Sequence, residues 1–337
     1  MPALTPAGTY PYPSSNKQGT ATVTITNGRT VPPGTEIEQQ LPEPPRRSSG
    51  VGFGRWWWAL PAVALTLVVT YMSTAFGAFF AFTDWTGLGD FNFVGLDNFI
   101  QVFEDPALLG SVRNTLLLAG GFVVFTNLLG LLFALALNRT LKTRYLLRAL
   151  IFMPVVLSSV AVSFIWKFIF AYDGPLNQAL EAGGLGQFKQ DWLANPALAL
   201  WCILAVMVWQ SIGFVMVIYL AGLATVPVEL EEAASLDGAG IWQIFRSITL
   251  PTIQPSVAIA TVLTLIQGLS VFDQVLTLTG GGPGDATQTL ATQIYTQTFL
   301  YGAFGLGAAA ALILTIFILI LALIQQFIVR DRANIGD

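Results

Sequence analysis

The stretch at residues 232–255 reads Glu-Ala-Ala-Ser-Leu-Asp-Gly-Ala-Gly-Ile-Trp-Gln-Ile-Phe-Arg-Ser-Ile-Thr-Leu-Pro-Thr-Ile-Gln-Pro and lies between two long apolar segments. It is too polar for the hydrocarbon core of a bilayer, yet its apolar residues are too regularly spaced for a plain loop. Pro227, just before it, suits the first turn of a helix, where a missing N–H is harmless. We therefore predict a helix-turn-helix over 227–255 that connects two membrane spans.

Two short helices account for this pattern. The carboxylates of Glu229, Glu231 and Glu232 suit a helix N-terminus, where the helix dipole favours negative charge. The two glycines within 237–240 end this first helix. A second helix follows, with an apolar face formed by Ile241, Ile244, Phe245 and Ile248. Such a segment either docks against a second protein or lies on the membrane surface as an amphipathic helix, and physics alone favours neither.

The composition is that of a membrane protein. The chain has 337 residues, of which 54% are hydrophobic and 10% charged, and its mean hydropathy is +0.67. Soluble domains carry about 25% charged residues, so this chain lacks the charge to cover a water-facing surface. The net charge of −4 argues against a nucleic-acid partner. The absence of histidine removes histidine-based catalysis, zinc sites and proton relays.

Six apolar segments approach the roughly 20 residues that a bilayer requires. The first follows Arg55 through three tryptophans, which suit the headgroup zone. The six predicted spans cover residues 57–82, 115–137, 147–172, 197–224, 256–278 and 301–329. Pro154 is placed near the start of the third span, where its missing donor is tolerated. We predict an all-α integral membrane protein with a transmembrane domain over 56–332 and a short C-terminal tail over 333–337.

Residues 1–55 form a separate segment, rich in Pro, Thr, Ser and Gly and poor in large aliphatic residues. Such a composition buries too little apolar area to offset its ordering entropy, so we predict a disordered tail. It lacks the charged start and apolar core of a signal peptide. Lysine and arginine precede the first span, separate the second from the third and follow the sixth, whereas the segment 84–105 contains none. With six spans, this distribution predicts that both termini are cytoplasmic. The helix-turn-helix then lies on the same side by alternation, although its own charge, mostly acidic, does not favour that side.

Several motifs resemble one transporter family. The pattern Glu-Ala-Ala at 232–234, Asp-Gly-Ala at 237–239 and Leu250-Pro251 is similar to the Glu-Ala-Ala loop of binding-protein-dependent ABC importer permeases. The segment 93–99, Phe-Val-Gly-Leu-Asp-Asn-Phe, and Asn114-Thr115 resemble sugar permeases of the maltose type. So does the sequence Leu-Thr-Gly-Gly-Gly-Pro-Gly at 278–284. The resemblance covers residues 56–332, and Gly240 departs from it, because the family often has serine there.

The resemblance implies a type I importer in which this chain forms half of the pore. A second, similar permease would supply the other half, and an extracellular or periplasmic binding protein would deliver a sugar. Two cytoplasmic subunits would bind ATP and magnesium, because this chain has no Gly-x-x-x-x-Gly-Lys-Ser/Thr loop of its own. The residues that would contact the ATPase are Glu232, Ala233, Ala234, Asp237, Gly238, Leu250 and Pro251. The expected location is the bacterial cell membrane, with lipid as the surrounding partner.

Polar side chains within the spans are candidates for the solute path, since hydrocarbon penalises them. Asp273 stands out, with Ser270 three residues earlier on the same predicted face. Serines more often bond to their own helix backbone, and Asp273 has a structural alternative at a span end. For Lys167, Trp166 and Phe214 too, a role in the solute path and a structural role both stay open. The candidates are Asp273, Gln267, Ser270, Gln210, Trp209, Asn127 and Ser163.

Two other functions remain as alternatives. The first is an ABC permease for a non-sugar solute such as glycerol phosphate or a polyamine. The second is an ion-coupled secondary transporter, although no inverted repeat is evident between the two halves of the chain. The chain is not expected to be an enzyme, since hydrolysis would belong to a partner subunit.

Overall fold

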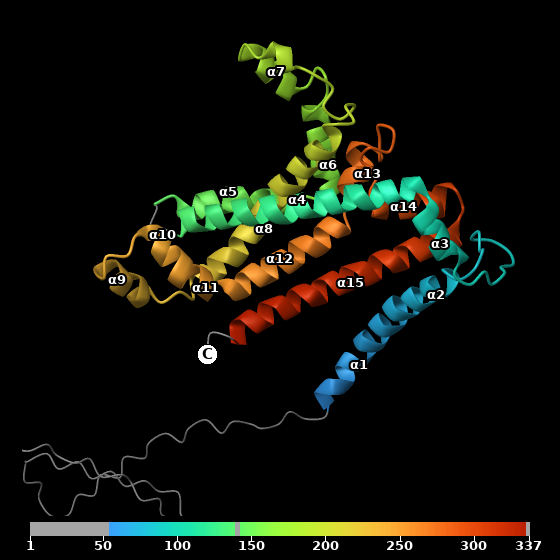
Figure 1. Ribbon diagram of the computed structural model, residues 1–337, viewed down its shortest axis with the longest axis horizontal. Coiled ribbons are helices and arrows are strands. Elements are labelled where there is room, and N and C mark those ends of the chain that lie inside the picture. The colour runs from blue at the N-terminus through green and yellow to red at the C-terminus, as the bar shows by residue number, and fades with distance from the viewer. Residues whose placement is uncertain (1–53, 139–141, 335–337) are drawn as a thin grey trace, which may run out of the picture. The chain divides into compact units, whose positions relative to one another are not determined.

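The computed structural model describes residues 54–138 and 142–334, and their regular structure is helical. One isolated antiparallel bridge joins Thr83 and Phe93 in this described part. The predicted disordered tail up to residue 53 and the last three residues of the predicted C-terminal tail lie outside the described residues. Figure 1 shows the arrangement of the helices.

Four helices have the length and hydropathy to cross a membrane. They are Trp58–Phe80, Pro106–Leu137, Ala199–Leu223 and Phe304–Gln325, with mean hydropathies between 1.7 and 2.9. The first is built from α1 (Gly54–Thr66), the π-helical η1 (Leu67–Met72) and α2 (Ser73–Phe80). The others are α4 (Pro106–Leu137), α8 (Ala199–Leu223) and α15 (Phe304–Asn334). Two bent helix pairs would bring the count of spans to six.

The predicted third span consists of two helices rather than one continuous helix. Helix α5 (Arg144–Val156) meets α6 (Ser159–Ile169) at an angle of 99°. Pro154 lies in the last turn of α5 rather than at the start of a span, and the two residues after α5 are extended. The hydroxyl of Ser158 then caps α6 by accepting from the N–H of Ala161 at 3.2 Å. Proline weakens the last turn of α5, and the serine starts a new helix in another direction.

The predicted fifth span, 256–278, is also interrupted. Helix α12 (Gln254–Leu269) ends before Ser270, and a separate short helix, α13 (Asp273–Leu278), begins three residues later. Ser270 and Asp273 therefore do not share a helical face, and Asp273 is an exposed residue in the first turn of α13. Before α12, the helix over Ile241–Thr252 meets it at 70°.

Three apolar clusters follow the bundle from end to end. One joins the C-terminal parts of α4 and α8 to the start of α12, through Leu137, Tyr219, Leu223 and Ile253. Another joins α4, α6, α8 and α13. The last joins α2, α4 and α15 to α3 (Asp97–Glu104) and α14 (Leu290–Tyr295). Helix α4 contributes to all three clusters and α8 to the first two, so these helices form the central pair of the bundle.

Close helix crossings depend on glycine. A Cβ at Gly130 of α4 would meet the side chain of Val215 on α8 at 2.6 Å. A Cβ at Gly213 of α8 would meet the backbone of α5 at Ile151 and Phe152. These small residues let the helix backbones approach, as membrane helix pairs require.

The segments that resemble sugar permeases are folded against the helix ends. Buried Asn98 donates to the carbonyls of Ala81 and Thr83, at 2.9 and 2.8 Å, and so satisfies the end of α2. A Cβ at Gly305 of α15 would meet the carbonyl oxygen of Thr83, so α15 packs directly on this junction. The segment 93–99 therefore fastens α2 to α15.

The glycine-rich loop lies at the same end of the bundle as α3 and α14. We call residues 279–297, which include this loop and α14, the rim. Asn114 of α4 donates to the carbonyl of Gln288 at 3.0 Å, and the hydroxyl of Thr115 accepts from the N–H of Leu290 at 2.8 Å. The hydroxyls of Thr279 and Thr287 lie 2.7 Å apart. Hydrogen bonds thus join Asn114-Thr115 to the segment that follows the glycine-rich loop, although the two are far apart in the sequence. Beyond α6, helix α7 (Pro175–Ala182) and the 3-10 turn η2 (Gly186–Phe188) precede α8.

Candidate coupling unit and solute path

The predicted helix-turn-helix is present and lies at the opposite end of the bundle from the rim (Figure 1). We call residues 227–252 the coupling unit. It consists of α9 (Val228–Leu236), α10 (Ile241–Ile244), the π-helical η3 (Phe245–Thr249) and α11 (Leu250–Thr252). Pro227 is the N-cap of α9 and Gly240 that of α10. Gly238 has φ of +83°, a left-handed conformation that glycine adopts without strain.

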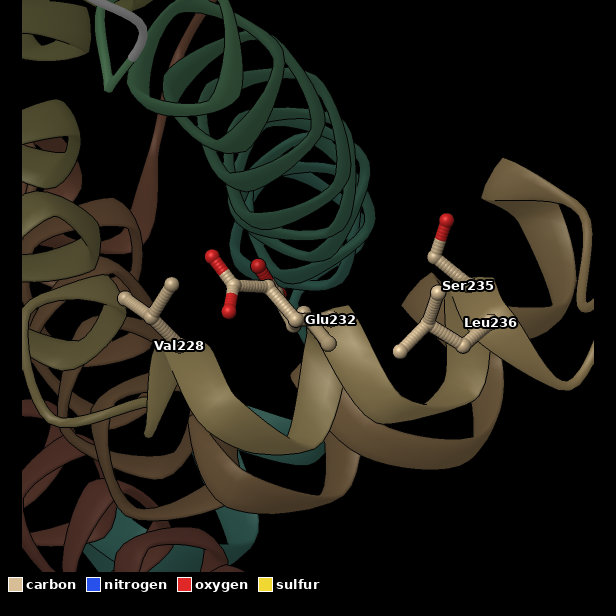
Figure 2. Close-up of a pocket in the computed structure, with 5 residues that line it drawn as sticks. Val228, Glu232, Ser235 and Leu236 are labelled. Carbon is tan, nitrogen blue, oxygen red and sulfur yellow. The ribbon is translucent and has the colours of Figure 1, made fainter.

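One face of α9 borders an open hollow of about 460 Å³. Val228, Glu232, Ser235 and Leu236 project from the same side of this helix, as Figure 2 shows, and Glu231 completes the lining. Glu232 is exposed. An exposed carboxylate beside apolar side chains is suited to receive a partner's cationic or hydrogen-bonding group.

The coupling unit also exposes large apolar side chains. Leu236 is 89% exposed, Ile241 80% and Trp242 71%. The predicted apolar face of the second helix is only partly inward, because Ile244, Phe245 and Ile248 are half-buried while Ile241 is exposed. Single exposed apolar residues are ordinary, but three within one short unit mark an interaction surface.

The other residues predicted to contact the ATPase have different positions in the unit. Ala233 is exposed and Ala234 is half-buried. Because their side chains are small, another protein could approach the backbone of α9 closely. Asp237 is the C-cap of α9. Leu250 and Pro251 begin α11, at the base of the unit and next to α12.

Polar side chains in the spans gather where the two broken helices meet. Buried Gln210 of α8 donates to the carbonyl of Leu157 at 3.0 Å and accepts from Gln274 at 3.3 Å. Leu157 lies in the break between α5 and α6, and Gln274 lies in α13. Gln210 therefore satisfies a backbone group that the break frees and links it to the second break.

Two aromatic rings and a glutamine lie in the neighbourhood of this link. The rings of Trp166 and Trp209 meet edge to face, with centroids 5.4 Å apart, and Trp209 is 40% exposed. Exposed Gln267 reaches the hydroxyl of buried Ser211 at 3.5 Å. Trp209 and Gln267 thus present an aromatic face and an amide at the surface of this chain.

Other solute-path candidates have bonds within the chain. Asn127 donates to Thr264 at 2.9 Å and accepts from the hydroxyl of Tyr219 at 2.8 Å, which ties α4, α8 and α12 together. Buried Ser163 bonds to the carbonyl of Ser159 at 2.7 Å, and Ser270 to that of Ile266 at 2.6 Å. Lys167 donates to the carbonyl of Thr277 at 3.3 Å. These contacts favour a packing role for their side chains.

Some residues that organise these sites had no distinctive sequence signal. Tyr219 and Thr264 stand inside apolar runs and read as packing residues. Gln274 directly follows Asp273, and a second polar residue in an apolar segment was a signal that could have identified it. Thr249, which binds Glu231, lies beside the Leu-Pro pair that the motif emphasises.

The fold and its two sites define a class: a helical membrane transport subunit with a structured unit at one end of its bundle. The chain belongs to the family of binding-protein-dependent transport system inner membrane components, whose model matches residues 126–334. It is thus a cell-membrane permease subunit of an ABC transporter, which decides against the ion-coupled alternative.

Relatives and a solved structure agree with this membership. The probable starch degradation products transport system permease protein AmyD of Thermoanaerobacterium thermosulfurigenes is 32% identical, over 83% of this chain and 95% of the relative. The multiple sugar-binding transport system permease protein MsmF of Streptococcus mutans is 36% identical, over 80% and 93%. A subunit of a bacterial alginate ABC transporter, solved with an alginate pentasaccharide-bound periplasmic protein, aligns with a TM-score of 0.72. It is 25% identical and covers 82% of this chain and 94% of its own.

Proposed function

We propose that this chain imports a sugar or oligosaccharide as half of a pore and is driven by a separate ATPase that docks on the coupling unit. The observation that carries the proposal is the surface of the coupling unit, where exposed Glu232 borders a hollow with Leu236 on α9, and Ile241 and Trp242 are exposed on α10. Such a surface suits a protein cleft, in which the apolar side chains are buried and the carboxylate is paired.

The charges at this end of the bundle support a cytoplasmic position for the coupling unit. Arg148 of α5 donates to the carbonyl of Leu137 at 2.7 Å, at the C-terminus of α4. Leu137 belongs to the same apolar cluster as Ile253, which follows the coupling unit directly. The basic segment 142–148 and the coupling unit therefore share one end of the bundle, and lysine and arginine favour the cytoplasmic side.

ATP would be hydrolysed outside this chain, by two partner subunits that also hold magnesium. Their closure would change the contacts on the coupling unit and so shift the spans between inward-open and outward-open states. An ATPase can shift this equilibrium only by binding the two states with different free energies. Glu232 would bind a partner group, and Gly238 would keep the turn that presents α9.

A sugar is the solute class that the relatives favour, since two of those compared carry names of sugar or starch-product transport systems. Trp209 and Gln267 are the side chains we place on the path, because sugars bind aromatic faces and amide groups. Asp273 is a further candidate, being exposed in the first turn of α13. A second permease and an external binding protein would complete the site.

The test is reconstitution of this chain in lipid with the second permease, the ATPase and the binding protein. Solute uptake and solute-stimulated ATP hydrolysis are then measured. We expect Glu232→Lys to lower uptake at least tenfold, because a cation replaces the carboxylate on the docking surface. Gly238→Pro should act alike, because proline cannot adopt a positive φ.

Glu229→Lys is the matched control, since Glu229 is an exposed carboxylate of the same helix. Its uptake should stay within twofold of the wild type. Full uptake by the Glu232→Lys variant would refute docking at α9. Stimulation by an osmolyte or a polyamine, but by no sugar, would keep the ATP-driven permease and replace the solute class.

A further inference from the structure

One side-chain hydrogen bond joins α9 to the remainder of the described chain. The hydroxyl of Thr249 donates to a carboxylate oxygen of Glu231 at 2.8 Å. Thr249 is buried, at 5% exposure, and Glu231 is half-buried. Bonds between a hydroxyl and an ionised carboxylate are among the stronger hydrogen bonds in proteins. The contact therefore holds two separate helices of the coupling unit in one geometry.

The two neighbouring glutamates of α9 face different surroundings. Both border the hollow, but Glu232 is exposed, whereas Glu231 is half-buried and its carboxylate accepts the hydrogen bond from Thr249. Successive residues on a helix point about 100° apart, so one can face a partner while the other faces its own protein.

Thr249 lies close to the bend between the coupling unit and the membrane. It is the last residue of the π-helical η3, and π-turns often mark functional positions. Four residues later, Ile253 stands at the 70° bend that leads into α12. The Glu231–Thr249 contact therefore attaches α9 close to the bend that leads into α12.

Beyond the bend, the contacts continue into the bundle. Ile253 is 1% exposed and packs in the cluster with Tyr219 and Leu223 of α8. A Cβ on Gly222 of α8 would meet the side chain of Ser256 and, at 3.4 Å, the Cβ of Ile253. Helix α12 therefore packs closely on α8, and the segment that follows Thr249 is in contact with both spans.

We propose that Glu231 and Thr249 form a brace that makes α9 and the start of α12 move as one body, so that force from the ATPase reaches the spans. Glu231 and Thr249 are positioning residues, since they touch neither solute nor nucleotide. The role rests on the proposed function, because it concerns how a docked ATPase moves this chain.

The main test compares variants in the complete reconstituted transporter. Thr249→Val removes the donor at nearly constant size, and Glu231→Gln removes the charge. We expect solute uptake per ATP hydrolysed to fall at least fivefold in Thr249→Val and less in Glu231→Gln, with co-purification of the ATPase within twofold of the wild type. Thr249→Ser, which keeps the hydroxyl, should restore the ratio to within twofold.

Glu229→Gln is the control, with the same chemical change on an exposed position of the same helix. Variants that match this control in uptake per ATP would overturn the brace. Loss of ATPase co-purification in Thr249→Val would also overturn it, because the contact would then shape the docking surface instead of transmitting force.

A second measurement separates the brace from the proposed function. Hydrogen–deuterium exchange of the α9 amides is measured on this chain in lipid, without partners. Thr249→Val should accelerate exchange in α9 at least fivefold relative to Glu229→Gln, because α9 loses its attachment. A wild-type transporter without ATP-dependent uptake would refute the proposed function, while unchanged exchange would refute the brace.

Discussion

The rim and the coupling unit, at opposite ends of the bundle, differ in the exposure of the polar side chains that their sequence motifs contain. In the rim, Gln288 is buried and donates to Gln293 at 2.8 Å and to Thr296 at 3.2 Å. Thr289 is buried as well and caps α14 in a capping box. In the coupling unit, by contrast, Glu232 is exposed.

A sequence motif can be recognisable for two reasons: its residues can hold their own fold together, or they can form a surface for another protein. Asn98, Asn114 and Thr115 satisfy backbone groups of their own chain, so the motifs that contain them describe how the fold is closed. Glu232 and Leu236 leave their groups at the surface, so the motif around them describes what the chain presents to another protein. Substitutions at the rim and in the segments that contain Asn98 and Asn114-Thr115 should therefore change stability, and substitutions on the coupling unit should change transport.

The largest effect on stability is expected at Gly281 of the rim. Its φ is +89°, and a Cβ there would meet the side-chain oxygen of Gln288. Gly281→Ala forces an L-residue into a left-handed conformation and displaces a glutamine that makes two hydrogen bonds. Together these cost about 3 kcal/mol. The midpoint of thermal unfolding in detergent, followed by tryptophan fluorescence, should fall clearly.

Two controls frame this prediction. Gly110→Ala in α4 adds a Cβ that would meet no described heavy atom within 4 Å, so its midpoint should not fall. Leu236→Ser on the coupling unit should also keep the wild-type midpoint, since this side chain is 89% exposed. A drop for Leu236→Ser as large as that for Gly281→Ala would erase the contrast between the two ends.

A smaller loss of stability is expected for Asn98→Ala. The amide of Asn98 serves two carbonyls at the end of α2, so its removal leaves both without that donor. At about 1 kcal/mol for each neutral hydrogen bond, the loss is about 2 kcal/mol. Gln101→Ala, an exposed change on the same helix, is the matched control in the same thermal measurement. Equal midpoints for the two variants would mean that α2 is held to α15 by apolar packing alone.

Much of this architecture follows from sequence periodicity and composition. The long spans at α4, α8 and α15 are continuous apolar runs, and the predicted spans overlap them closely. The helix-turn-helix can be predicted equally well, because two glycines and a proline mark the ends of its helices. Hydropathy locates such elements, since a bilayer imposes a minimum apolar length.

The breaks in the third and fifth spans could not be read in this way. A window of hydropathy does not distinguish a straight helix from two helices joined at 99°. The break at Leu157 persists because Gln210, more than 50 residues away, donates to its carbonyl, and Thr289 does the same for Val271 at 3.1 Å. Such compensation depends on contacts across the fold, which also explains why Asp273 was assigned to a span interior.

The smallest effect, a change in the local stability of one loop, is expected at Asp84. This residue lies in the loop that leads from α2 to the segment 93–99. The backbone N–H of Asn92 donates to its carboxylate at 2.6 Å and the Asn92 amide at 3.1 Å. These bonds, the backbone bond first, lower the pKa of Asp84 below its ordinary value of 3.8. Because the folded pKa is depressed, the stabilisation is present above the ordinary pKa and is lost as the pH falls through the folded value.

Amide exchange at Asn92 tests this local contact. At neutral pH, Asp84→Asn should exchange about threefold faster than the wild type, because its amide replaces the ionised acceptor and weakens the bond. Below the folded pKa of Asp84 the ratio should approach one, since the wild-type carboxyl is then neutral as well. Asp90→Asn, an exposed change in the same loop, should leave the ratio near one at both pH values. A ratio that does not change with pH would mean that the loop is held by its backbone bonds, such as the 3.1 Å bond from the N–H of Asp84 to the carbonyl of Asn92. The loop between α2 and the segment 93–99 would then resemble the coupling unit, with an exposed carboxylate that contributes little to its own fold.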